Sequence, residues 1–132
     1  MLFPYWEVHG DGDPRLLPLV PLTIRGWRDT TVVALVDSGA EHNVFGNDVA
    51  ERVGVPLDDG TPVTVTGIGD HHHPGTLISL ELQLGKIRWT APTIISPAAN
   101  DRVLLGQAGF FAFFTVTFRL ARKMIEIRRS HA

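Results

Sequence analysis

Cysteine is absent from this chain of 132 residues. A disulfide framework, a thiolate metal site and a cysteine nucleophile are therefore excluded. The lack of cysteine fits a reducing compartment, and we expect a cytoplasmic location. The sequence starts without a basic segment and reaches an acidic residue at Glu7, so we expect no secretory signal.

The chain also lacks an excess of one charge and a long apolar run. It has 12 Lys and Arg against 14 Asp and Glu, which gives a formal net charge of −2. Nucleic-acid-binding domains are usually strongly basic. The longest apolar run in the C-terminal half, residues 110–114, is far too short to span a bilayer. We expect no nucleic-acid partner and no membrane partner.

The overall composition is that of a globular protein. Hydrophobic residues make up 44% of the chain and charged residues 20%. A chain of this length buries enough surface to fold as one domain without a disulfide or a metal. Because the first residues are rich in Pro, Gly and Asp, we expect a loose N-terminal arm at residues 1–18 and a single domain at residues 19–132.

Glycine and proline divide the chain into short segments, which favours an all-β domain. Alternating or continuous apolar residues predict strands at 20–25, 31–36, 61–66, 77–84, 88–95, 114–120 and 123–127.

Two short helices are also predicted. Asp48 followed by Glu51 resembles a capping box, and Gly54 and Pro56 would end that helix. Residues 107–113 show no strand-like alternation and could form one or two helical turns.

An aspartate follows the most apolar of the predicted strands. Residues 31–36 are typical of a strand buried on both faces, and Asp37, Ser38 and Gly39 come directly after it. An ionised carboxylate is costly out of water, and Ser38 and Gly39 offer a hydroxyl and backbone N–H groups to it. Asp-Ser-Gly is also a common turn tripeptide, so an ordinary strand-ending turn is the alternative interpretation.

Two further motifs follow in the chain. Gly67, Ile68 and Gly69 lie between two predicted strands, and residues 103–106 read Val-Leu-Leu-Gly. In this order and spacing the three motifs resemble those of the retropepsin-like aspartic proteases, over about residues 19–128. The resemblance implies an all-β acid-protease barrel with one or two short helices and a β-hairpin flap. It also implies hydrolysis of peptide bonds in a peptide or protein substrate, without a cofactor.

Such a reaction needs two carboxylates. One takes a proton from water while the other donates a proton to the scissile carbonyl oxygen, and two carboxylates about 3 Å apart share one proton. The sequence has one Asp-Ser-Gly, so we expect a homodimer in which each subunit contributes Asp37. The alternative is a catalytically weak or inactive protease-like dimeric module that binds peptides or proteins. A third interpretation is a β-barrel with a coincidental turn.

The resemblance also implies roles for single residues. Asp37 would be catalytic; Ser38, Gly39 and Ala40 would support its loop; and substrate would contact Gly39, Glu41, Gly67, Ile68 and Gly69. Gln107 stands where retroviral enzymes carry an arginine that pairs with the acid after the alanine. A neutral Gln107 can hydrogen-bond to Glu41 but cannot form a bidentate ion pair with it.

Four histidines remain to be interpreted. His71, His72 and His73 are consecutive, so on an extended chain they point to alternate sides, and no nearby Cys or Glu completes a ligand set. We expect an exposed flap tip there and no metal; a metal site that includes Asp70 is the alternative. His42 is expected as a partly exposed loop residue, with a place in a side-chain pocket as its alternative.

Overall fold

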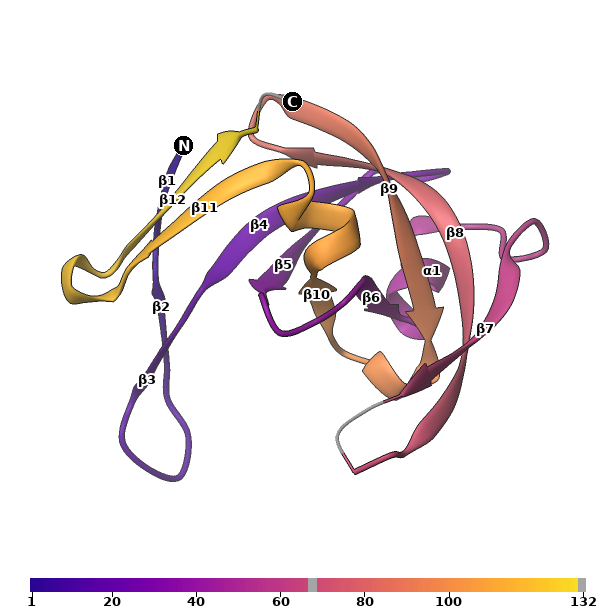
Figure 1. The fold of residues 1–132 in the computed structure, drawn as a ribbon, viewed down its shortest axis with the longest axis horizontal. Helices are drawn as coiled ribbons and strands as arrows, with labels where there is room; N and C mark the ends of the chain where they lie inside the picture. The colour runs from indigo at the N-terminus through magenta and orange to yellow at the C-terminus, as the bar shows by residue number, and fades with distance from the viewer. Residues whose placement is uncertain (67–68, 131–132) are drawn as a thin grey trace.

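The computed structural model describes residues 1–66 and 69–130, drawn in Figure 1. Its strands are β1 (Leu2–Pro4), β2 (Trp6–Val8), β3 (Arg15–Leu17), β4 (Leu19–Arg25), β5 (Thr30–Val36), β6 (Asn43–Gly46), β7 (Thr61–Thr66), β8 (His72–Leu84), β9 (Ile87–Ser96), β10 (Val103–Leu105), β11 (Phe114–Arg119) and β12 (Met124–Arg129). The helical segments are α1 (Asn47–Val53), the 3₁₀ turns η1 (Pro97–Ala99) and η3 (Leu120–Arg122), and the π-helical turn η2 (Gln107–Phe111). None of the described helices is long and apolar enough to cross a membrane.

The main sheet closes on itself. Its strand order is β4-β5-β10-β6-β9-β8-β7, and an additional pairing between β4 and β8 turns the first six of these strands into a barrel. Strand β7 lies outside this ring and pairs with the first half of β8 as an antiparallel hairpin. The all-β prediction is therefore confirmed, and the sheet takes the form of a six-stranded barrel.

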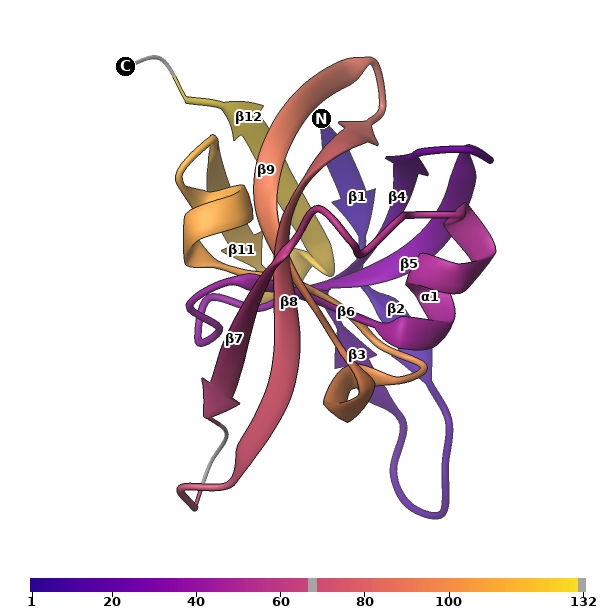
Figure 2. The ribbon, with the colours of Figure 1, turned by 90° about the vertical axis from the view of Figure 1, so that its right-hand side faces the viewer.

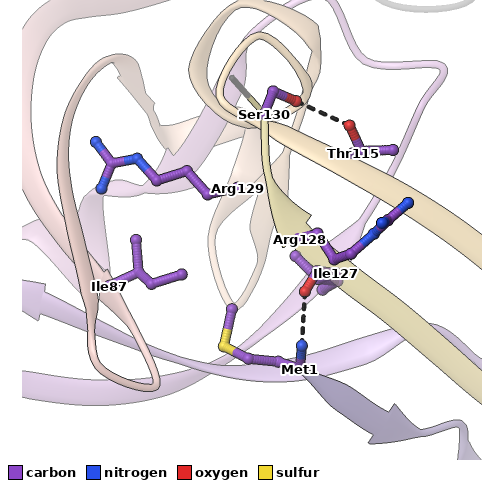
Figure 3. Close-up of a pocket in the computed structure, with 7 residues that line it drawn as sticks. All are labelled: Met1, Ile87, Thr115, Ile127, Arg128, Arg129 and Ser130. Carbon is purple, nitrogen blue, oxygen red and sulfur yellow. Dashed lines mark hydrogen bonds between the residues drawn. The ribbon is translucent and has the colours of Figure 1, made fainter.

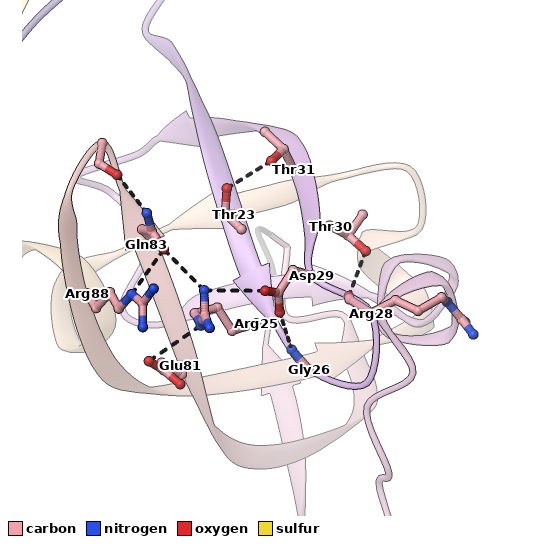
Figure 4. Close-up of polar contacts among 11 residues, drawn as sticks. Thr23, Arg25, Gly26, Arg28, Asp29, Thr30, Thr31, Glu81, Gln83 and Arg88 are labelled. Carbon is pink, nitrogen blue, oxygen red and sulfur yellow. Dashed lines mark hydrogen bonds and ion pairs between the residues drawn. The ribbon is translucent and has the colours of Figure 1, made fainter.

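The closing seam combines apolar and polar contacts. Ile24 on β4 lies opposite Leu82 on β8, and both side chains are fully buried. On the outside of the seam, Arg25 forms ion pairs with Asp29 at 3.3 Å and Glu81 at 3.6 Å (Figure 4). Because these ion pairs are partly exposed to solvent, each contributes little to stability, and the buried aliphatic contact dominates.

Aromatic side chains close one end of the core. Phe110 and Phe114 are buried and stack with ring centroids 4.9 Å apart, and the ring of Trp89 packs edge-on against Phe114 at 4.7 Å. The indole Nε1 of Trp89 donates a hydrogen bond of 2.9 Å to the carbonyl oxygen of Gly109. This contact fixes η2 against β9.

The long hairpin differs from its prediction at one end. Strand β7 has the predicted bounds, whereas β8 begins at His72 and not at residue 77. Residues 72–76 join the strand because they continue the antiparallel pairing with β7, from Thr61 opposite Leu77 to Thr66 opposite His72. Pro74 and Gly75 are residue types typical of loops, and the cross-strand pairing overrides that tendency.

The first 18 residues carry three short strands instead of a loose segment. Strand β1 pairs with β12, which also pairs with β11, so that both ends of the described chain meet in a three-stranded sheet. Strands β2 and β3 form a separate two-stranded ribbon. Composition suggested flexibility here because it carries no information about a partner strand distant in sequence. The domain boundary between residues 18 and 19 stays a prediction.

The start of α1 also corrects the sequence interpretation. The helix begins at Asn47 with Gly46 as its N-cap residue, and no side chain caps it. The Oδ2 atom of Asp48 instead accepts a hydrogen bond of 3.0 Å from the backbone N–H of Asp101. The predicted end is confirmed, since Gly54 adopts the left-handed conformation with φ of 79°.

Replacing Ile24 with alanine tests the seam. We expect the free energy of unfolding to fall by about 2–5 kcal/mol, because the change leaves a cavity at a fully buried position. Val33 on β5 is 43% exposed, so Val33→Ala is the matched control and should cost less than about 1 kcal/mol. Urea denaturation measures both, and equal losses would contradict the assignment of the seam to the core.

Candidate active site

Asp37 follows the last residue of β5, directly over the end of β10. Strand β10 lies between β5 and β6, parallel to the first and antiparallel to the second. The backbone N–H of Asp37 donates a hydrogen bond of 2.9 Å to the carbonyl oxygen of Leu105. The loop that connects β5 to β6 therefore passes over the end of β10, which lies between these two strands and supports the loop.

The loop holds the carboxylate of Asp37 by one oxygen. Its Oδ1 atom accepts a hydrogen bond of 2.9 Å from the backbone N–H of Gly39, and its carbonyl oxygen accepts one of 3.2 Å from Ala40. Among the described residues, no hydrogen bond reaches Oδ2. The side chain is partly exposed, so this second oxygen is available to water or to a neighbouring acid.

Gly106 lies beneath the loop at a position where no side chain fits. A Cβ atom there would lie 2.6 Å from the carbonyl oxygen of Ala40 and would also collide with the carbonyl oxygen of His42. The next residue, Gln107, donates its backbone N–H to the same Ala40 oxygen at 2.8 Å. The glycine thus allows the two backbones to approach closely enough to hydrogen-bond.

Asn43 is a polar residue of this region that the sequence interpretation missed. It is fully buried, and its Oδ1 atom accepts a hydrogen bond of 2.9 Å from the backbone N–H of Gly106. Its amide also packs against the Cα of Gly109, where a Cβ would collide with it. The only feature of the sequence that could have indicated a buried role for Asn43 is its place directly before the apolar pair Val44 and Phe45.

Gln107 binds the loop differently from the contact considered in the sequence. Its Nε2 atom donates a hydrogen bond of 2.6 Å to the carbonyl oxygen of Ser38, and not to the carboxylate of Glu41. The carbonyl oxygen of Glu41 accepts a hydrogen bond of 2.9 Å from the backbone N–H of Ala108. The Glu41 side chain is exposed and forms no ion pair within the described part of the chain.

A cleft of about 760 Å³ opens in front of Asp37. The loop contributes Gly39, Ala40 and Glu41 to one wall, and the β7–β8 hairpin contributes the opposite wall. The aliphatic residues of the lining are Val44, Val63, Val65, Leu77, Ile94, Ala98, Ala99 and Leu104. Its other side chains are polar or charged: His42, Thr64, Thr66, His73 and Arg102. A cleft that combines a carboxylate with these aliphatic residues is suited to binding an extended chain with aliphatic side chains.

The residues predicted for the flap tip are only partly described. Gly67 and Ile68 lie outside the described residues. Gly69 is exposed and has a φ of 83°, a conformation that favours glycine. The hairpin that carries these residues lines the cleft through Val63, Thr64, Val65 and Thr66.

The histidines are divided between the cleft and the hairpin. His73 and His42 line the cleft, and the Nδ1 atom of His42 is buried without a hydrogen-bond partner among the described residues. His72 instead lies 3.2 Å from the hydroxyl of Thr66 through its own Nδ1. Over residues 1–66 and 69–130, no three His, Asp or Glu side chains are grouped as metal ligands.

A second hollow of about 700 Å³ lies at the end of the three-stranded sheet (Figure 3). Met1, Arg128 and Arg129 are among its lining residues, and the N-terminal amine donates to the carbonyl oxygen of Ile127 at 2.8 Å. None of the described lining residues is a carboxylic acid. The described lining thus lacks the carboxylate that an aspartic protease uses.

A closed six-stranded barrel with an Asp-Ser-Gly loop seated on Leu-Leu-Gly defines the retropepsin-like fold, and similar solved structures agree. A retropepsin-like aspartic protease from Rickettsia conorii superposes with a TM-score of 0.61 at 16% identity, over 83% of this chain and 88% of that one. The EIAV protease in complex with the inhibitor HBY-793 superposes with a TM-score of 0.57 at 15% identity, over 69% of this chain and 82% of that one.

The family follows from the sequence itself. A family model described as aspartyl protease matches residues 20–108, and this chain belongs to that family. The match spans the Asp37 loop, the β7–β8 hairpin and the turn at Gly106. No curated protein matches the chain by sequence.

Replacing Gly106 with alanine tests the support beneath the loop. The added Cβ would force Ala40 and the Asp37 loop away from β10, so we expect a loss of at least about 1–3 kcal/mol in the free energy of unfolding. Gly12 has no atom within 4 Å of an added Cβ, and Gly12→Ala should change stability by less than about 1 kcal/mol. Chemical denaturation at one protein concentration measures both variants; similar values would count against the close approach.

Proposed function

We propose that this protein is an aspartic endopeptidase in which two Asp37 carboxylates, one from each subunit of a homodimer, activate a water molecule. The observation that carries the proposal is the presentation of Asp37. Its backbone N–H donates to Leu105, one carboxylate oxygen accepts from Gly39, and the residue lines a cleft that also contains many aliphatic side chains.

The chemistry follows from a pair of carboxylates that share one proton. The ionised carboxylate accepts a proton from water as the water oxygen attacks the scissile carbonyl carbon, and the protonated carboxyl donates to the carbonyl oxygen. The resulting tetrahedral diol collapses, the C–N bond breaks and the leaving nitrogen takes up a proton. The reaction needs no cofactor and forms no covalent intermediate with the enzyme.

One chain supplies half of this machinery, which is the reason for proposing a dimer. The sequence has a single Asp-Ser-Gly, and its loop is partly exposed. A two-fold axis beside the loop would place Asp37 next to its own copy, and such self-complementary pairing is the commonest form of oligomer. Ser38, whose carbonyl oxygen is held by Gln107, is then placed to contact the second loop.

The hairpin and the cleft walls are proposed to bind the substrate. The β7–β8 hairpin, with Gly67, Ile68 and Gly69 at its tip, would act as a flap over an extended peptide. Gly39 and Glu41 would contact the peptide from the opposite wall. Gln107 stands in place of the arginine that pairs with this acid in retroviral enzymes, and the Glu41 carboxylate forms no ion pair with the described residues. It can therefore bind a polar group of the substrate.

Asp37→Asn should abolish cleavage. The amide keeps the shape of the side chain but cannot accept or share the proton, so we expect kcat/KM for a peptide library to fall by several orders of magnitude. Mass spectrometry of the cleavage products is the measurement, and thermal unfolding verifies that the fold is intact.

Asp58→Asn is the matched control, since Asp58 is an exposed turn residue outside the cleft. Full activity in Asp37→Asn would refute the catalytic role of Asp37. A wild-type protein that binds peptides through the cleft without cutting them would instead support the binding-module alternative.

Specific activity should also depend on protein concentration. If each chain supplies one carboxylate, dilution below the dimer dissociation constant removes the complete site, and activity per chain falls. Sedimentation and activity measured over the same concentration range should give the same midpoint. Full activity in a sample shown to be monomeric would contradict the shared site.

A further inference from the structure

A two-stranded ribbon stands apart from the barrel. It consists of β2 and β3, with Trp6 opposite Leu17, and of residues 9–14 between them. In the described part of the chain the two strands pair only with each other. Figures 1 and 2 show the ribbon and the β7–β8 hairpin projecting from the same end of the barrel, well separated from each other.

The ribbon leaves more of its surface exposed to solvent than is usual for a two-stranded sheet. A lone two-stranded hairpin is at best marginally stable in water, so it normally packs against a further surface. Trp6 is 43% exposed, and Glu7 and Arg15 are exposed beside it. Tryptophan side chains in such positions are frequent anchors of protein–protein interfaces. The ribbon therefore has the character of an arm that contacts another molecule.

The base of the ribbon is adjacent to the active-site loop. The carbonyl oxygen of Pro18, directly after β3, accepts a hydrogen bond of 2.9 Å from the backbone N–H of Val36. Val36 is the residue before Asp37. The end of the ribbon is therefore joined by one hydrogen bond to the neighbour of Asp37, the residue that needs a second copy of the chain.

We propose that the β2–β3 ribbon packs against the second copy of this chain and forms part of the homodimer interface, with Trp6 as its anchor. This inference rests on the proposed function, in which the two Asp37 carboxylates lie about 3 Å apart. Each strand of the ribbon is about 10 Å long. A copy that brings its own Asp37 so close to this one also comes within reach of the ribbon.

The need for a second Asp37 also favours a second copy of this chain, over an unrelated protein, as the partner of the ribbon. An unrelated partner seated on the ribbon would leave Asp37 without the second carboxylate that the proposed reaction needs. A second copy instead covers Trp6 and completes the pair of carboxylates through one and the same contact. The two-fold relation gives each subunit the same arrangement, so two ribbons contribute to one interface.

Trp6→Ala and Trp27→Ala form a matched pair that tests the ribbon. Trp27 is 85% exposed and lies in the turn between β4 and β5, so it controls for the loss of an exposed tryptophan. In sedimentation equilibrium we expect Trp6→Ala to raise the dimer dissociation constant at least about 10-fold, as for an interface anchor. Trp27→Ala should leave it unchanged. Activity lost in dilute Trp6→Ala should return at high concentration, which a folding defect would not allow.

Hydrogen exchange of the wild-type protein tests the same inference without a substitution. Amides of residues 6–8 and 15–17 should exchange slowly above the dimer dissociation constant and faster below it, whereas amides of the turn around Trp27 should not change. Exchange of the ribbon that is independent of concentration in a sample that does dimerise would overturn the interface but leave the shared site intact. A protein that is monomeric throughout, with cleavage that depends on Asp37, would overturn both.

Discussion

The position of Asp37 depends on one close contact between two segments that are far apart in sequence, the loop after β5 and the turn after β10. The contact is made by backbone atoms, with Leu105 accepting from Asp37 and Ala40 accepting from Gln107. It requires Gly106, because a side chain there would occupy the place of the loop. Each such hydrogen bond contributes only about 0.5–1.5 kcal/mol, so together they determine where the carboxylate lies more than how stable the protein is.

The elements that could be predicted from the sequence are those whose signal is local. The alternation of Leu80, Leu82 and Leu84 gave β8 its inward face, and Gly54 ended α1. The beginning of β8 could not be predicted, because residues 72–76 are extended through pairing with β7. Strands β1, β6 and β10 are too short for a periodic signal and exist because a partner strand lies beside them.

The candidate site divides in the same way. Asp37 and the Leu-Leu-Gly motif were identifiable because the order of the motifs along the chain is informative. Asn43 was not, because its importance comes from a hydrogen bond to Gly106 that exists only in the folded chain. The histidines illustrate the same limit: only the strand pairing decides that His73 lines the cleft while His72 lies beside Thr66.

The insertion of β10 between β5 and β6 has a consequence for the order of folding. Strands β5 and β6 are synthesised well before β10, the strand that separates them, and β10 is parallel to β5. Pairings of this kind close long loops and form slowly. A nascent chain that has not yet released residues 103–111 from the ribosome holds Asp37 on a loop with nothing beneath it. The Asp37 loop therefore reaches its final position only after residues 103–111 have emerged from the ribosome.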